Sequence, residues 1–350
     1  MNSATEVGKN ANRISCTIAI PVYNRQDFIR RAVDSALEQD VPDLEILVAD
    51  NCSTDHTWDV LQSYADSRLR LVRNERNVGL FGNFNRCLSL ARGEYLRFLC
   101  SDDKLVPGCL SREIEIMGQH SNVSLLSTRN RLVNEKGHRL REGANLLRPG
   151  IYRSDQAVLA VLWSIAHYAL NPLNYPSGVL LRRAAALRAD RFDTTLRMLG
   201  DVDYFLRVLD YGDLAVVDTV GCEITIHEGM ESVRVASDGV RDSEFLMLVE
   251  RYRVQLEQES TYKRILQQVA AHATGVALKY WYRRMSQASE QHLKIAYSTG
   301  TGCSGIVVGI ARLIGLRLLL KIAGIRPTPI RAAQPLTDTI GPEAGGACDR

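Results

Sequence analysis

The chain has 350 residues, of which 45% are hydrophobic and 24% are charged, as is usual for a globular protein with a packed core. A net charge of +3, without any basic run containing interleaved aromatic residues, argues against nucleic acid as a partner. The eight cysteines form no Cys-x-x-Cys pair and no group with histidines at zinc-ligand spacing, which favours a reducing, cytoplasmic compartment.

The N-terminal segment is polar, and residues 1–14 are predicted to be flexible, with no apolar stretch typical of a secretory signal. The next region alternates between apolar runs and amphipathic segments. Its apolar runs predict buried strands at residues 17–22, 44–49, 69–72 and 94–99. A helix is expected after each of the first three strands. Asp27 and Asp55 are predicted to cap two of these helices, and Gly93 is predicted to end the third. This alternation predicts βαβ units and a parallel sheet.

Polar residues stand where these strands end, which is where open parallel sheets bind their ligands. Tyr23, Asp50 and Asp102 occupy such positions after the first, second and fourth strands. The adjacent carboxylates Asp102 and Asp103 repel each other, and they suit a Mg²⁺ or Mn²⁺ ion that bridges a diphosphate. The alternative for this pair is a solvated loop that caps the next helix. Asp50 would accept hydrogen bonds from a nucleoside, or would simply close an Asx turn.

The regular alternation of strands and helices ends after residue 127. The pattern predicts a strand, a turn and a strand over residues 131–140, then a helix over 154–168 and a strand over 179–181. A helix over residues 201–211 is followed by two strands, at 214–217 and 223–226. From about residue 240 the chain is predicted to be helical.

Two common phosphate-binding motifs are missing. The first strand is followed by residues 23–25 (YNR), with no Gly-x-Gly-x-x-Gly, and the chain has no Gly-x-x-x-x-Gly-Lys-Ser/Thr. A dinucleotide-dependent oxidoreductase and a P-loop enzyme are therefore disfavoured. Phosphates bound at these strand ends would need a metal ion and side chains to hold them.

An ordered set of motifs resembles that of family 2 glycosyltransferases with the GT-A fold. The segments that carry the resemblance are residues 20–25 (IPVYNR), 45–55 (EILVADNCSTD), 77–79 (NVG), 91–95 (ARGEY) and 101–103 (SDD). A later segment, residues 200–207 (GDVDYFLR), resembles the motif that opens a helix near the acceptor. The resemblance covers roughly residues 15–230. It implies an α/β fold with a Rossmann-like, mostly parallel sheet flanked by helices, followed by a C-terminal helical extension.

The resemblance also implies roles for individual residues. The donor would be bound by Pro21, Val22, Tyr23, Asn24, Asp50 and Asp102. Asp103 and His227 would hold Mg²⁺ or Mn²⁺, and Asp201 would be the general base. For Asp201 the alternative is a helix N-cap, and for His227 it is a histidine without a ligand role. The chain departs from the usual pattern at Cys100, where many members have Asp, and at Gly200, where Glu is usual.

The implied reaction is inverting transfer of a sugar from a UDP- or TDP-type nucleoside diphosphate sugar to an acceptor hydroxyl. The acceptor would be a glycan or a lipid-linked glycan in bacterial surface polysaccharide assembly. The departures at Cys100 and Gly200 leave open an alternative from another class, a catalytically inactive protein that binds sugar nucleotides or acts as a scaffold.

The chain is predicted to divide into a nucleotide-sugar-binding part (15–130), an acceptor-binding part (131–235), a helical extension (236–326) and a disordered tail (327–350). Residues 303–323 are apolar but are interrupted by Arg312, Arg317 and Lys321. The chain has no run of about 18 uncharged apolar residues, so the sequence predicts no clear membrane span. Three interpretations of this stretch stay open: a core helix, an interface of a homo-oligomer, or a helix lying on the inner face of the cell membrane.

Overall fold

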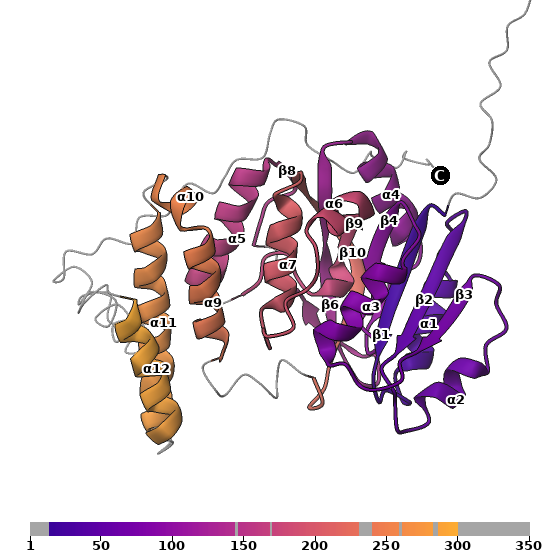
Figure 1. Cartoon of the computed structure of the whole chain (residues 1–350), viewed down its shortest axis with the longest axis horizontal. Coiled ribbons are helices and arrows are strands. Elements are labelled where there is room, and N and C mark those ends of the chain that lie inside the picture. Colours follow the sequence, from indigo (N-terminus) through magenta and orange to yellow (C-terminus); the bar gives the residue numbers. More distant parts are fainter. Residues whose placement is uncertain are drawn as a thin grey trace, which may run out of the picture.

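The computed structural model describes residues 14–143, 146–168, 170–230, 240–258, 261–282 and 286–299. The predicted flexible start (apart from Ile14), the 303–323 stretch and the predicted tail lie outside these residues. A ten-stranded sheet with helices on both faces forms the centre of the described part (Figure 1). This arrangement confirms the predicted α/β class.

The first half of the sheet is parallel, with the order β3-β2-β1-β4. Its strands are β1 (Cys16–Val22), β2 (Leu44–Asp50), β3 (Leu69–Arg73) and β4 (Tyr95–Phe98). They are connected by α1 (Ile29–Leu37), α2 (Thr57–Gln62) and α3 (Leu80–Leu90). Every residue of β1 and β2 is buried, because helices cover both faces of a doubly wound sheet.

The second half of the sheet is mixed. It continues from β4 through β9 (Val179–Arg182), β6 (Val123–Asn134) and β10 (Asp213–Ile226) to β5 (Lys104–Leu105), and β7 (Arg139–Glu142) and β8 (Gly150–Tyr152) pair with β6 and β10. Of these pairings only β6 with β10 is parallel. The expectation of a mostly parallel sheet therefore holds for β1 to β4, and in the second half for the pairing of β6 with β10. The two strands predicted at 214–217 and 223–226 are one strand, β10, with irregular register between Val216 and Cys222. The boundary predicted after residue 130 falls inside β6.

The helices form two layers. The core side chains of α1, α2 and α4 (Cys109–Gln119) pack on one face of the sheet. Those of α3, α5 (Ser154–Tyr168), α6 (Arg183–Arg188) and α7 (Gly200–Leu209) pack on the other face. A 3₁₀ turn, η1 (Pro176–Gly178), precedes β9.

The C-terminal helices are α9 (Val240–Arg251), α10 (Arg253–Gln258), α11 (Tyr262–Tyr282) and α12 (Ser286–Ser298). Figure 1 shows them gathered at the end of the molecule opposite β2 and β3. Phe245, Leu248 and Ile265 join the same core cluster as α5 and α7, so these helices are packed onto the sheet domain. None of the described helices is long and apolar enough to cross a membrane.

Three predicted helix ends differ from the structure. The N-cap residue of α1 is Phe28, with no side-chain capping bond, so Asp27 does not cap this helix. Asp55 accepts a hydrogen bond from the Thr57 N–H at 3.0 Å, one residue ahead of the N-cap of α2. Gly93 does not end α3 in the left-handed conformation. It is required because a Cβ there would lie 2.4 Å from the Thr17 nitrogen of β1.

Candidate active site

A cavity of about 420 Å³ opens at the carboxyl ends of β1 and β4. We call it the donor cavity. Most of the predicted site residues line it, namely Pro21, Val22, Tyr23, Asn24, Asp102, Asp103 and Asp201. Residues from both halves of the sheet thus meet at one concave surface, as expected for a ligand site in an open α/β sheet.

The loop after β1 is held by the loop after β2. Asn24 adopts a left-handed conformation with φ of 50°, and its backbone N–H donates to Ser53 Oγ at 3.0 Å. Its side-chain oxygen accepts from the Thr54 N–H at 2.9 Å. These bonds leave Tyr23 on the wall of the cavity with 40% of its surface exposed, so its ring is available to a planar ligand group.

Asp50 lies at the end of β2, as predicted, but it is fully buried and is not among the residues that line the donor cavity. Its carboxylate accepts a hydrogen bond from the Ser53 N–H at 3.2 Å and lies 3.1 Å from Arg73 Nε. Asp50 therefore closes its own loop by a bond to the residue three positions on, rather than by an Asx turn to residue 52. In this conformation it shapes the loop beside Asn24 without facing the cavity.

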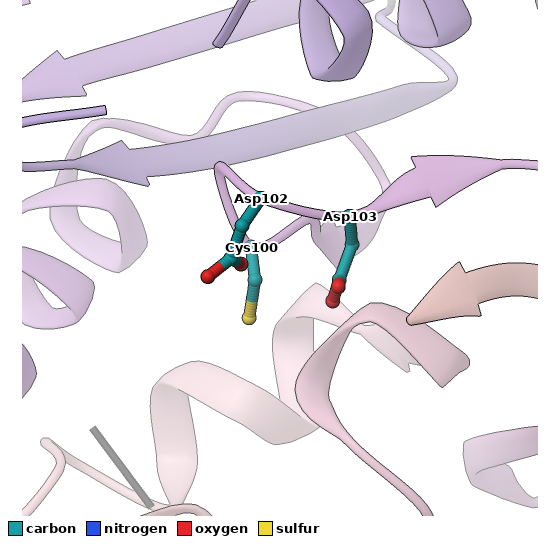
Figure 2. A group of neighbouring side chains, drawn as sticks. All are labelled: Cys100, Asp102 and Asp103. Carbon is teal, nitrogen blue, oxygen red and sulfur yellow. The ribbon is translucent and has the colours of Figure 1, made fainter. Parts of the chain in front are cut away.

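The acidic turn after β4 brings three side chains together. The ligand atoms of Cys100, Asp102 and Asp103 all lie within 4.8 Å of one another. Figure 2 shows the three side chains extending from the turn toward the same side, with the thiol between the carboxylates in this view. The two carboxylates are donors of the kind that Mg²⁺ and Mn²⁺ prefer, whereas a thiol suits softer metals. Burial raises the pKa of the Cys100 thiol, and the neighbouring Asp103 and Asp102 raise it further.

Asp102 is the carboxylate that faces His227. Its Oδ2 lies 2.9 Å from His227 Nε2 and 3.6 Å from Arg25 Nε. The His227 ring directly follows β10 and stacks on Phe28 at 4.8 Å between centroids, which fixes its orientation. The predicted metal pair was Asp103 with His227, but the structure places the imidazole against Asp102.

Asp103 is held by the protein on both oxygens. Ser177 Oγ donates to Oδ2 at 2.6 Å, and the Thr225 N–H donates to Oδ1 at 3.1 Å. The side chain is buried, and this burial, together with the charge of Asp102, raises the pKa of Asp103 well above its usual range. Asp103 therefore ties the acidic turn to η1 and β10, and it is less free than Asp102 to bind a cation.

Asp201 lies in the first turn of α7, and its Oδ1 accepts a hydrogen bond from the Val202 N–H at 2.8 Å. Burial raises the pKa of Asp201 to about 6, and the Val202 bond offsets part of this rise. A carboxylate with this pKa is ionised at neutral pH and still basic enough to accept a proton from a hydroxyl in a transition state.

Gly200, the residue before Asp201, packs against an aromatic ring. A Cβ at Gly200 would lie 2.4 Å from Cε2 of Phe81, which also lines the donor cavity. The Phe81 ring, on α3, occupies the space that the side chain of the usual Glu would enter. The bulk of this ring therefore accounts for glycine at position 200.

Three residues of the site escaped the sequence analysis. Arg25 stood within the first motif, but nothing in the sequence indicated that it would reach Asp102. Ser177 and Thr225 contact Asp103 from positions 74 and 122 residues away in the chain. Ordinary serines and threonines at such separations carry no signal in a single sequence.

Comparisons with known proteins agree with this architecture. Residues 17–169 match the family model described as glycosyl transferase family 2. A solved structure of S. aureus TarS in complex with UDP-GlcNAc superposes with a TM-score of 0.52 at 19% identity, covering 82% of this chain and 92% of that one. At this identity the likeness shows the fold, which is therefore GT-A.

Two relatives illustrate the similarity in sequence. An uncharacterised protein of Mycobacterium tuberculosis is 31% identical over 59% of this chain and 66% of its own length. The UDP-Glc:alpha-D-GlcNAc-diphosphoundecaprenol beta-1,3-glucosyltransferase WfaP of Escherichia coli is 40% identical over 29% of this chain and 40% of its own length. The match thus spans between two fifths and two thirds of these relatives. Residues 17–169 thus match glycosyl transferase family 2, and the ordered motifs and the fold agree with that family.

Proposed function

We propose that this protein transfers a sugar from a nucleoside diphosphate sugar to an acceptor hydroxyl, with inversion at the anomeric carbon. The observation that carries the proposal is a single cavity with the acidic turn on one wall and Asp201 on another. Bacterial polysaccharide assembly is the setting that the names of relatives support, including WfaP and the succinoglycan biosynthesis protein ExoO of Rhizobium meliloti.

The donor would lie along the ends of β1 and β4. Tyr23, Pro21 and Val22 offer an apolar wall for the base, and the loop that Asp50 closes supports this wall. Arg25 and Arg197 also line the cavity and offer guanidinium groups to the diphosphate. The bound UDP-GlcNAc named for TarS supports a donor of the UDP type.

A divalent cation would fit beside Asp102, with His227 Nε2 as a further ligand and Asp103 holding the turn. When bound, Mg²⁺ or Mn²⁺ neutralises charge on the diphosphate leaving group. The Asp102 side chain is 17% exposed at the cavity, whereas Asp103 is buried with two donors, so we assign the principal contact to Asp102.

The chemical step requires one base. Asp201 accepts the proton of the acceptor hydroxyl, and the oxygen attacks the anomeric carbon from the side opposite the diphosphate. The bond from the anomeric carbon to the diphosphate oxygen breaks as the new glycosidic bond forms, which inverts the configuration. The Val202 N–H holds the Asp201 carboxylate in place.

The test separates chemistry from binding. Asp201→Asn is expected to abolish transfer and donor hydrolysis while UDP-sugars, screened with and without Mn²⁺, still raise the melting temperature. Asp210→Asn, at the other end of α7, serves as the matched control. Transfer by D201N at a near wild-type rate would show that Asp201 is not the base. Donor binding without hydrolysis by the wild-type protein would support the inactive, scaffold alternative.

A further inference from the structure

A second cavity, of about 270 Å³, lies next to the donor cavity and shares Tyr175, Met198 and Asp201 with it. We propose that this second cavity binds an acceptor sugar that carries an anionic group, either a carboxylate or a phosphate. The inference rests on the proposed function, because it places the acceptor beside the base. It goes further in naming the acceptor's chemical class.

The shared wall explains how an acceptor could reach the donor. Asp201 is one of three residues that line both spaces. A sugar in the second cavity can therefore present a hydroxyl to the Asp201 carboxylate while the rest of its ring stays outside the donor cavity. Met198 and Leu199 supply apolar surface of the kind that packs against a sugar ring.

Arg241 gives the second cavity a buried positive charge. Its side chain is 19% exposed, and Asp242, its ion-pair partner among the described residues, lies 3.4 Å away. Asp242 is shared with His272 at 3.1 Å and His292 at 3.6 Å, and Arg241 also donates to the Ile165 carbonyl at 3.5 Å. Among the described residues the partly buried guanidinium thus shares a single carboxylate with two histidines, which favours an anionic ligand.

Arg141, on β7, supplies a second cation to this cavity. It lines the same cavity, and within the described ranges no carboxylate pairs with it. The adjacent Glu142 is engaged by Arg131 at 3.3 Å and Arg139 at 2.9 Å. Two guanidinium groups facing one cavity form a site for a carboxylate or phosphate, since these anions accept paired N–H donors.

An amide cluster completes the lining. Asn130 is 2% exposed, and its Oδ1 has no hydrogen-bond partner among the residues described. Its Nδ2 donates to Asn174 Oδ1 at 3.0 Å, and Asn171 donates to the Asn174 backbone oxygen at 2.7 Å. A buried acceptor left open beside this cavity suits a ligand hydroxyl. The lining therefore provides hydroxyl recognition as well as charge.

The experiment compares matched ligands by calorimetric titration in the presence of UDP and Mg²⁺. One arm uses methyl glucuronide, galacturonide and mannuronide against their amides, and the other uses the hexose 1-phosphates against the methyl hexosides. We expect at least one acid or phosphate to bind about tenfold more tightly than its neutral partner. The arm in which the charged ligand binds more tightly shows whether the site prefers a carboxylate or a phosphate. If no anionic probe binds better than its neutral partner, the proposal is overturned.

Substitutions of the two arginines test whether they cause the preference for anionic ligands. Arg141→Gln and Arg241→Gln should each reduce the anionic preference about tenfold, and Arg241→Lys should retain part of it if R241Q does not fold. Arg139→Gln, on the same strand but outside the cavity lining, is the matched control. An unchanged preference in R141Q, with R241Q either unchanged or unable to fold, would also overturn the proposal. Donor hydrolysis by the wild-type protein, measured without acceptor, tests the proposed function separately.

Discussion

Asp201 combines two demands at one residue. As the base that we propose, its carboxylate must be ionised to accept a proton, yet burial opposes ionisation and raises its pKa to about 6. The fold therefore loses stability as pH rises through this value, since the folded state favours the protonated form. A base with a raised pKa is the stronger base, so the same burial that costs stability assists the chemistry.

A pH profile tests this assignment. We expect kcat/KM for transfer to fall about tenfold per pH unit below pH 6, because protonated Asp201 cannot accept the hydroxyl proton. Initial rates across the acid range, with donor binding measured in parallel, give the profile. An acid limb near the ordinary carboxylate value of 3.8 would contradict the raised pKa.

The division of roles between the two acidic residues gives a second prediction. Asp102→Asn should weaken Mn²⁺ binding about tenfold in the presence of UDP, because it removes a carboxylate ligand beside His227. Asp103→Asn should bind Mn²⁺ nearly as well as the wild type but unfold at a lower temperature, because Asp103 ties the turn to Ser177 and Thr225. Electron paramagnetic resonance titration measures free Mn²⁺ directly. The opposite order of affinities would return the metal contact to Asp103.

At the scale of elements, helices α3 and α7 meet through Phe81 and Gly200. The Phe81 ring is packed between Phe84 and Phe192, with centroids 6.0 and 5.8 Å away, so it cannot move aside freely. We expect Gly200→Ala to destabilise the fold by about 1–3 kcal/mol through overpacking. Urea unfolding measures this loss. The double variant G200A with Phe81→Leu should recover part of it, and no recovery would mean that the clash lies elsewhere.

The parallel half of the sheet could be predicted because its signals are local. Apolar runs of strand length, separated by amphipathic helices, placed β1 to β4 within a residue or two, and the α5 prediction matched both ends. In the mixed half the strand predicted at 179–181 matches β9, and the strand, turn and strand predicted over 131–140 fall on β6 and β7. The sequence did not show that β10 continues through the polar, irregular stretch around Asp218. Candidate site residues at strand ends were found for the same local reason.

The orientation of those candidates depended on distant partners. Asp50 turned toward Arg73, and His227 turned toward Asp102 rather than Asp103. Both outcomes follow from contacts between segments that are adjacent only in the folded sheet. A single sequence specifies such contacts through packing and charge compensation, which motif spacing does not reveal.

At the scale of the whole molecule, Asp242 ties α9 to α11 and α12 through His272 and His292. Burial alone would raise the pKa of Asp242, but hydrogen bonds from the two histidines and the nearby Arg241 hold it well below its usual range. A lowered carboxylate pKa contributes stability that is present above the unfolded value of 3.8 and is lost as pH falls below it.

Asp242→Asn is accordingly expected to cost about 3 kcal/mol of unfolding free energy near neutral pH, because it leaves the Arg241 guanidinium without its carboxylate partner. The cost should shrink as both proteins are titrated below pH 3.8, where the wild-type carboxylate begins to lose its advantage. Denaturant unfolding at several pH values measures the difference. A cost that stays constant down to the acid-unfolding limit would rule out the charged interaction.

The two hydrogen bonds to Asp103 have a consequence for synthesis on the ribosome. The acidic turn emerges early, but Ser177 and Thr225, which hold it, and His227, which faces Asp102, are translated much later. A nascent chain that ends within the parallel half of the sheet has the family's motifs without an assembled donor site. The protein therefore becomes able to bind its donor only after β10 has left the exit tunnel and joined the sheet.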